Sequence, residues 1–368
     1  MADSTIDHVD VSVYRIPTDA PEADGTITWD ATTMVVVEVR AAGQLGLGFT
    51  YSGVPAGQMV SDVLAPLLVG RDPVDIPAAS EAMNREVRNL GRPGTAACAI
   101  SACDIALWDL KARLLDLRLA RLLGRFRSEV PIYGSGGFTT YSDEQLRDQF
   151  GHWVHEQHIP RVKLKVAESW GARVDRDLQR IALARDIIGP DTALFIDANG
   201  GYTAKQAIRV AEAIQDADVT WFEEPVSSDD LAGLRRVRHR VTADVAAGEY
   251  GYDLSTFALL LNHGAVDCLQ ADITRCGGVT AWLQVAALAA AHHIELSGHC
   301  APHLHLDAAA ATPNLRHLEW FHDHVRIEDM LFDGAASPRP GGLLSPDLDR
   351  VGHGLSLRTD AADEYRIA

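Results

Sequence analysis

Strand-like and helix-like patterns occur in separate groups in the first third of the chain. Runs rich in β-branched and aromatic side chains lie at residues 6–16, 34–40 and 45–51. The segment AAGQLG separates the last two runs, and its glycines indicate a hairpin. Helical periodicity then covers about residues 57–66, 74–89 and 95–123. This order predicts an α+β domain over residues 1–128. Between the predicted strands and helices lie a loop near residues 17–30 and the turn FTYSG at 49–53.

From about residue 130, short apolar runs alternate with helical stretches. The runs begin near Val130, Arg161, Thr192, Val219, Asp244, Ala265, Ile294 and His317. Helical periodicity fills most of the intervals, for example over 171–186, 203–215, 229–238 and 277–291. The alternation predicts parallel strands joined by crossover helices, and eight such strands suit a closed barrel. We therefore expect a barrel catalytic domain over residues 129–330.

The last segment, residues 331–368, is rich in Gly and Pro and then strand-like. We expect it to leave the barrel and to pack back against the N-terminal domain. A doubly wound open sheet is the alternative, but it has fewer strands and a glycine-rich dinucleotide turn near its start. The nearest candidate, GQLGLG at 43–48, lies between two predicted strands and is better explained as a turn.

Ionisable side chains stand at the ends of seven consecutive predicted strands. They are Lys163 and Lys165, Asp197, Glu223 and Glu224, Glu249, Asp272, His299 and Glu319, with Asn199 beside Asp197. The active site of a (β/α) barrel lies at the C-terminal ends of its strands. One such residue would be an ordinary solvated loop charge, whereas the whole series predicts a catalytic site at the barrel mouth.

Three of these carboxylates, Asp197, Glu223 and Glu249, follow one another at intervals of 26 residues. Carboxylates at adjacent strand ends repel one another unless a cation lies between them. Three oxygen ligands leave positions open for water or substrate, which suits octahedral Mg²⁺, with Mn²⁺ as a close second. The triplet predicts a metal site.

Two further pairs predict acid–base chemistry. Lys163 and Lys165 share one face of a strand, so each disfavours the charge of the other and lowers its pKa. Asp272 and His299 end neighbouring strands, where a carboxylate would fix the imidazole tautomer. Glu319 could donate a hydrogen bond if burial kept it protonated.

A zinc cluster is the alternative interpretation of the segment SGHCAPHLH. It would use His299, Cys300, His303 and His305, but this spacing matches no common zinc pattern. The last two histidines should also lie on the helix that follows the strand. The sequence therefore favours the pairing of His299 with Asp272.

Composition narrows the function further. The formal net charge of −18 argues against a nucleic-acid or anionic-membrane partner. No apolar run approaches a membrane span, and the start MADSTIDHVD does not resemble a signal peptide. The five cysteines lack paired spacing, which indicates reduced thiols and a cytoplasmic protein.

Taken in order, KLK, DAN, FEEP, GEY, the segment from Asp272 to CGG, SGHC and HLEW resemble the enolase superfamily, specifically its mandelate racemase-like branch. The resemblance implies a modified (β/α)₇β barrel, classed as α/β, capped by an α+β domain built from both ends of the chain. It implies Mg²⁺ on Asp197, Glu223 and Glu249. Asp272 distinguishes the chain from the muconate-lactonizing and dipeptide-epimerase branch, which has lysine there.

The resemblance also implies roles for the remaining residues. Lys165 would be one acid/base and the His299–Asp272 pair the other, on the opposite face of the substrate. Lys163 and Glu319 would stabilise the enediolate oxygens. Candidate substrate-binding residues are Asn199, Trp29, Tyr51, Tyr133 and Trp320. A homo-oligomer, often an octamer in such proteins, is expected.

The reaction implied is removal of the proton next to a carboxylate. We favour dehydration of an acid sugar to a 2-keto-3-deoxy sugar acid. A cycloisomerase that opens a lactone or anhydro ring, and a racemase or epimerase of a 2-hydroxy acid, would use the same residues. A non-catalytic, metal-dependent binding protein is a remote alternative, because both predicted bases are present.

Overall fold

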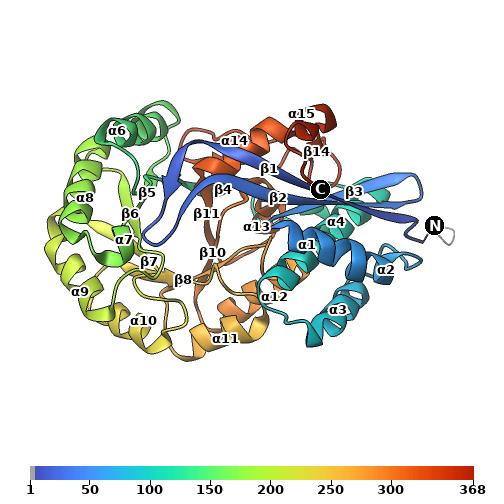
Figure 1. The fold of residues 1–368 in the computed structure, drawn as a ribbon, viewed down its shortest axis with the longest axis horizontal. Coiled ribbons are helices and arrows are strands. Elements are labelled where there is room, and N and C mark those ends of the chain that lie inside the picture. Colours follow the sequence, from blue (N-terminus) through green and yellow to red (C-terminus); the bar gives the residue numbers. More distant parts are fainter. Residues whose placement is uncertain (1–4) are drawn as a thin grey trace.

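The computed structural model describes residues 5–368 and contains a closed barrel beside a capping domain (Figure 1). The barrel consists of eight parallel strands, β4 (Val130–Gly136), β5 (Arg161–Lys165), β6 (Ala193–Asp197), β7 (Val219–Glu223), β8 (Asp244–Ala247), β9 (Cys268–Ala271), β10 (Glu295–Gly298) and β11 (Leu315–Phe321). Neighbours in the sequence are neighbours in the sheet, and β11 pairs with β4 to close it. The predicted barrel is confirmed, and the open sheet is excluded.

Helices surround the barrel on its outer side (Figure 1). The principal ones are α6 (Asp143–Gly151), α8 (Val174–Ile188), α9 (Ala204–Ala213), α10 (Leu231–Arg238), α11 (Leu254–Asn262), α12 (Gly278–Ala291), α13 (Pro302–Ala310) and α14 (His322–Leu331). Shorter turns are η3 (His152–Glu156), α7 (Glu168–Gly171) and η4 (Gln215–Ala217). One apolar face of each crossover helix is buried against the strands, as with Leu234 and Val237 of α10.

The capping domain has its own sheet and core. Its antiparallel strands are β1 (His8–Ala23), β2 (Thr28–Ala41) and β3 (Gln44–Tyr51). Its helical elements are α1 (Val54–Met59), η1 (Val60–Leu64), α2 (Ala65–Leu68), α3 (Ile76–Glu86), η2 (Val87–Asn89), α4 (Thr95–Leu114) and α5 (Leu119–Leu123). Helix α4 contacts both the sheet and α12 of the barrel, which explains its burial on nearly every side.

The segment 17–30, expected as a loop, is a β-hairpin. Strand β1 runs on to Ala23 and β2 starts at Thr28, with an irregularity in pairing between Pro17 and Glu22. The hairpin reaches across to the barrel (Figure 1), where the Trp170 amide donates to Gly25 O at 2.8 Å. The sequence of this segment is interrupted by prolines and does not predict a strand. Contact with the barrel loops therefore stabilises the hairpin.

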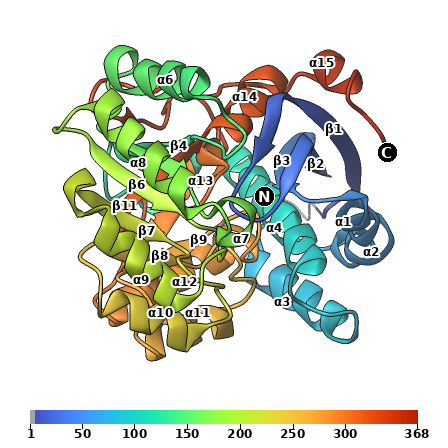
Figure 2. The same ribbon diagram turned by 60° about the vertical axis from the view of Figure 1, so that its left-hand side comes forward.

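The C-terminal segment contacts both domains. Strand β13 (Leu343–Leu344) pairs with barrel strand β4, while β12 (Phe332–Asp333) pairs with β14 (Ser356–Leu357). Helix α15 (Thr359–Asp363) then brings the last residues to β1 (Figure 2). The Ile367 amide donates to Val13 O at 2.8 Å, so the last residues lie beside β1 of the capping sheet.

A buried ion pair links the two domains. Arg118, just before α5, donates from Nε and Nη2 to the two carboxylate oxygens of Asp307 on α13, both at 2.7 Å. The Ala120 amide donates to the same carboxylate at 2.9 Å. Both charged side chains are almost completely buried, so each depends on the other for its charge to be compensated.

We expect Arg118→Met to lower the free energy of unfolding by about 3–5 kcal/mol, because Asp307 would remain buried without its counter-ion. Urea denaturation measures this change. Arg85→Met is the matched control, since the Arg85–Glu81 pair is exposed and should contribute less than about 1 kcal/mol. Equal losses in the two variants would show that the buried pair does not stabilise the domain contact.

Candidate active site

Strand register brings the predicted site residues together. Lys165 of β5 pairs with Asp197 of β6, and Asp197 pairs with Glu223 of β7. Because side chains alternate along a strand, these three point to the barrel interior at the same level. Asp272 and His299 directly follow the paired residues that end β9 and β10. The C-terminal ends of the strands thus form one polar cluster.

The three carboxylates predicted to hold a metal converge. Asp197, Glu223 and Glu249 each offer an oxygen within 4.8 Å of the others, and all three side chains are buried. Glu249 follows Gly248, whose φ of +138° and closeness to Gln270 O leave no room for a Cβ. One Glu249 oxygen, Oε2, is buried without a hydrogen-bond partner. This oxygen-rich set fits a hard divalent cation.

Both lysines contact these carboxylates. Lys163 Nζ lies 2.5 Å from Glu223 Oε1 and 2.7 Å from Glu319 Oε1, and Lys165 Nζ lies 2.5 Å from Asp197 Oδ2. Burial alone lowers the pKa of Lys165, but Asp197 and the other carboxylates outweigh burial and raise it above its usual value. The repulsion from Lys163 acts in the predicted direction, yet it is too weak to lower the pKa as we expected.

Asp197 and Glu223 differ in their pKa values. Burial raises the pKa of Asp197, but Lys165 and Lys163 lower it more, to about 2. For Glu223, burial together with the Asp197 charge raises the pKa to about 8. The Trp221 indole also donates to Glu223 Oε2 at 2.9 Å. Asp197 is therefore the firmly ionised member of the pair.

His299 is held by Asp272. Its Nδ1 lies 2.9 Å from Asp272 Oδ2, and the other Asp272 oxygen accepts from the Thr274 amide at 2.7 Å. This leaves Nε2 directed at the carboxylates, 3.3 Å from Glu249 Oε2. Burial alone lowers the pKa of His299, but Glu249, Glu319 and Asp272 together raise it. The imidazole can therefore carry a proton toward the centre of the site.

Glu319 differs from our expectation of a protonated hydrogen-bond donor. It accepts from Ser135 Oγ at 2.6 Å and from the Cys300 amide at 3.0 Å, besides Lys163. Burial raises the pKa of Glu319, but Lys163 lies so close that the pKa falls well below its usual value. Glu319 is therefore an ionised hydrogen-bond acceptor. The sequence of its own strand could not predict this, because Lys163 comes from another strand.

The candidate substrate-binding residues separate into two groups. Asn199 lies beside Asp197 with Oδ1 buried and unpartnered, and Trp29 lies in the docked hairpin, donating to Glu22 at 2.8 Å. Tyr51 stacks on the ring of His324, behind the site. Asn199, Trp29 and Tyr51 therefore lie beside the cluster or beside residues that contact it.

Tyr133 contacts the cluster from the barrel interior, with Lys163 Nζ 5.3 Å from the centre of its ring, whereas Trp320 is not brought to the site. Tyr133 is fully buried in the barrel interior against Phe195 and Trp221. Trp320 follows the inward-facing Glu319, so it faces outward and packs edge-on against His303. Ser135 and Arg275 are contacts of the site that sequence reasoning missed, because the first strand end carries no charge and Arg275 lies in a loop.

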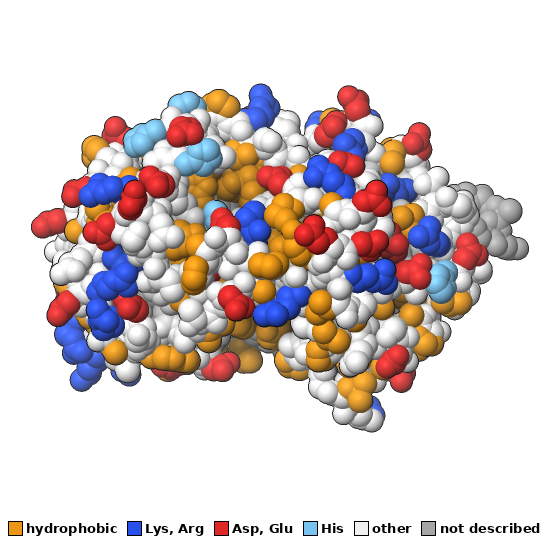
Figure 3. All heavy atoms as spheres, turned by 45° about the horizontal axis from the view of Figure 1, so that its top comes forward, with side chains coloured by type: hydrophobic (Ala, Val, Ile, Leu, Met, Phe, Trp, Pro, Cys, Tyr) orange, Lys and Arg blue, Asp and Glu red, His pale blue; other side chains and the backbone are white. Residues whose placement is uncertain are grey.

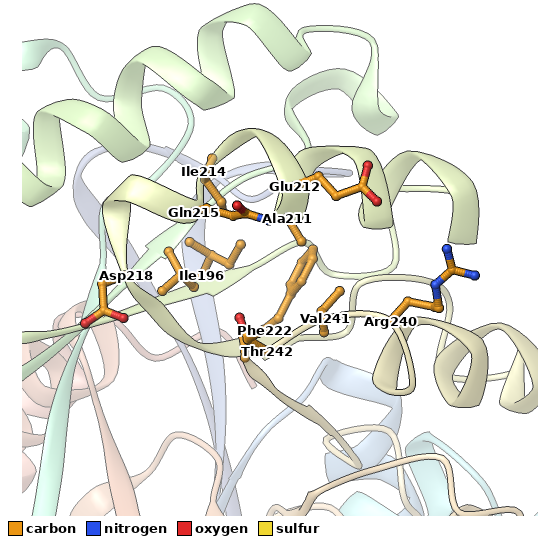
Figure 4. A pocket seen from close by; sticks show the side chains of 12 residues that line it. Ile196, Ala211, Glu212, Ile214, Gln215, Asp218, Phe222, Arg240, Val241 and Thr242 are labelled. Carbon is orange, nitrogen blue, oxygen red and sulfur yellow. The ribbon is translucent and has the colours of Figure 1, made fainter.

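The surface of the molecule is hollowed in places. Figure 3 shows a depression bordered by hydrophobic side chains, with histidines at its rim. A separate cleft of about 390 Å³ lies on the outside of the barrel wall, where Ile196 and Phe222 meet α9 (Figure 4). The site residues do not line that cleft, so it is unrelated to the chemistry at the strand ends.

Comparison with known proteins agrees with this geometry. Residues 8–124 match the mandelate racemase / muconate lactonizing enzyme, N-terminal domain, and residues 145–361 match the enolase C-terminal domain-like family. L-talarate/galactarate dehydratase of Salmonella typhimurium is 32% identical over 343 residues, 88% of this chain and 85% of that protein. The 3,6-anhydro-alpha-L-galactonate cycloisomerase of Streptomyces coelicolor is 31% identical over 359 residues, 94% and 98% of the two chains.

Solved structures share the fold of the whole chain. A mandelate racemase/muconate lactonizing enzyme-like protein from Rubrobacter xylanophilus superposes with a TM-score of 0.95 at 48% identity, covering 99% of this chain and 100% of that one. A racemase from Streptomyces coelicolor A3(2), crystallised with bound magnesium, gives 0.92 at 29% identity, covering 98% and 100%. Fold and site together define a member of the enolase superfamily. Within it, the chain belongs to the mandelate racemase-like branch.

Proposed function

We propose that this chain is a Mg²⁺-dependent acid-sugar dehydratase that forms a 2-keto-3-deoxy sugar acid. The observation that carries the proposal is the placement of two proton-transfer groups, Lys165 and His299, on different sides of the three-carboxylate cluster. The similarity to a dehydratase supports the reaction class. The orphaned Glu249 oxygen and the all-oxygen ligand set support magnesium.

Asp197, Glu223 and Glu249 would hold the metal, which when bound supplies positive charge beside the substrate carboxylate. A proton next to a carboxylate is too weakly acidic for an unaided base. Lys163 adds its own positive charge at the same place, and Glu319, oriented by Ser135, holds Lys163 there. These groups stabilise the charge that develops on the enediolate oxygens.

Lys165 and His299 then transfer the protons. Asp197 and Glu249 raise the pKa values of Lys165 and His299, and compensation of these carboxylate charges by a bound cation would favour the neutral bases. The neutral form of Lys165 or His299, according to the configuration at C2, takes the C2 proton, and the C–H electrons form the enediolate. Protonated His299 gives its proton to the departing C3 hydroxyl, which leaves as water as the C2–C3 double bond forms. The enol so formed tautomerises to the 2-keto-3-deoxy acid. Asp272 keeps Nε2 of His299 directed at the substrate throughout.

A cycloisomerase is the second candidate, and the similarity to such an enzyme specifically favours it. The same groups would expel a ring oxygen in place of a hydroxyl, opening the ring. A racemase would return the proton from the opposite face without elimination. All three outcomes require the same abstraction at C2, so the product distinguishes them.

Proton NMR of acid sugars and their lactones, incubated with the protein and Mg²⁺ in D₂O, tests the proposal. Signals of a 2-keto-3-deoxy acid are expected and would identify the substrate. A ring-opened product would establish the cycloisomerase, and deuterium at C2 without elimination would establish the racemase. No change with any of these carboxylates would contradict acid-sugar chemistry.

Location and assembly belong to the same proposal. No helix among residues 5–368 combines the length and apolar character that crossing a bilayer needs. The five cysteines are all buried and unpaired, which suits a reducing cytoplasm.

We also propose a homo-oligomer, such as an octamer, that acts on a small carboxylate without nucleic acid. Light scattering coupled to size-exclusion chromatography would give a monomer mass if assembly is wrong.

A further inference from the structure

Cys300 lies against the proton-transfer group of the site. Its Sγ is 3.4 Å from His299 Nε2 and 3.5 Å from Glu319 Oε2. The third side of this triangle, from His299 Nε2 to Glu319 Oε2, is 3.7 Å. All three side chains are buried, and the proposed dehydration uses no thiol. The triangle offers one nitrogen, one sulfur and one oxygen ligand.

Its dimensions match a tetrahedral zinc centre. With Zn–S of about 2.3 Å, Zn–N of about 2.05 Å and Zn–O of about 2.1 Å, tetrahedral angles place the ligand atoms about 3.4–3.6 Å apart. The three measured separations, 3.4, 3.5 and 3.7 Å, lie close to this range. Cys, His and carboxylate are also the ligand types that zinc selects, whereas magnesium avoids thiolate.

The surroundings hold these ligands in place. Asp272 binds His299 Nδ1 and leaves Nε2 free, the arrangement that orients metal-ligating histidines. The Cys300 amide donates to Glu319 Oε2, and Lys163 and Ser135 hold the other Glu319 oxygen. Glu249 Oε2, which is assigned above to magnesium, lies 3.3 Å from His299 Nε2, so this triangle directly adjoins the magnesium carboxylates.

We infer that His299, Cys300 and Glu319 form an inhibitory Zn²⁺ site beside the magnesium carboxylates. Zinc takes the lone pair of His299 Nε2, which then neither accepts nor donates a proton. The thiol gives up its proton to solvent as the Zn–S bond forms. Neither His303 nor His305 takes part, because Glu328 and Ala336 bind the former and Ile273 and Ala301 bind the latter.

Cobalt substitution tests the site without any substrate. Titrating Co²⁺ into the magnesium-loaded protein should produce one equivalent of a thiolate-to-cobalt charge-transfer band. Cys300→Ser should lose this band and bind Zn²⁺ about tenfold more weakly, or worse, by calorimetry. Cys98→Ser, which changes another buried cysteine, should keep both. Circular dichroism checks that each variant is folded.

Inhibition is the second readout. In excess Mg²⁺, Zn²⁺ should stop turnover of the wild type and of Cys98→Ser, while Cys300→Ser resists, each protein being compared with its own zinc-free rate. The absence of a charge-transfer band, or its persistence in Cys300→Ser, would overturn the inference. So would inhibition that excess Mg²⁺ relieves equally in every variant. The cobalt spectrum stands whether or not the proposed substrate class is correct.

Discussion

Lys165→Ala and His299→Asn should each reduce turnover by on the order of 10³-fold or more, because each removes one of the two groups that move protons. Neither residue belongs to the proposed magnesium ligands Asp197, Glu223 and Glu249. Lys165 in fact lies 2.5 Å from Asp197, so its removal takes away a positive charge that competes with a cation. Magnesium affinity, measured by calorimetry, should therefore be unchanged or tighter in both variants.

Matched controls separate these effects from general damage. Lys205→Ala and His292→Asn replace exposed residues of the same types on the barrel helices or their ends and should retain full turnover. The product assay by NMR serves for all four variants. Wild-type rates in both Lys165→Ala and His299→Asn would contradict the two-base assignment, whatever the substrate.

Glu249→Gln should weaken Mg²⁺ binding by about tenfold or more and reduce turnover in parallel, since it removes one of three anionic ligands while keeping the size of the side chain. Adding Mg²⁺ in large excess should restore part of the lost activity. Calorimetry of the metal alone measures the affinity. The amide is isosteric, so the buried turn after Gly248 is expected to survive.

Glu212→Gln is the control for that substitution, because Glu212 is an exposed acid on α9. Its magnesium affinity should equal that of the wild type. An unchanged affinity in Glu249→Gln as well would mean that Asp197 and Glu223 hold the metal without it. The carboxylate triplet would then be wrong as a ligand set.

Much of the barrel could be predicted from the sequence because buried parallel strands leave a clear signal. Apolar runs beginning at Val130, Arg161 and Val219 become strands that start at those residues. Polar residues at the ends of such strands then face one mouth, whatever the details of packing. The sequence alone was therefore sufficient to predict that the carboxylates, the lysines and His299 lie at one end of the barrel.

Features set by packing between distant segments could not be predicted. The ionised state of Glu319 depends on Lys163, which arrives from another strand. The hairpin over residues 17–30 depends on barrel loops that receive its tip. Trp320 is a different case: strand alternation next to Glu319 already places it outward, and the prediction overlooked that constraint.

The meeting of the final residues with β1 has a consequence for biosynthesis. Because Tyr365 and Ile367 hydrogen-bond with Arg15 and Val13, these contacts cannot form until residue 367 has left the ribosome. Contacts of such long sequence separation form late and slowly. The hairpin that docks over the barrel mouth continues the same strand. Nascent chains should therefore be able to form the barrel strands, the last of which ends at Phe321, before residues 365–367 reach β1.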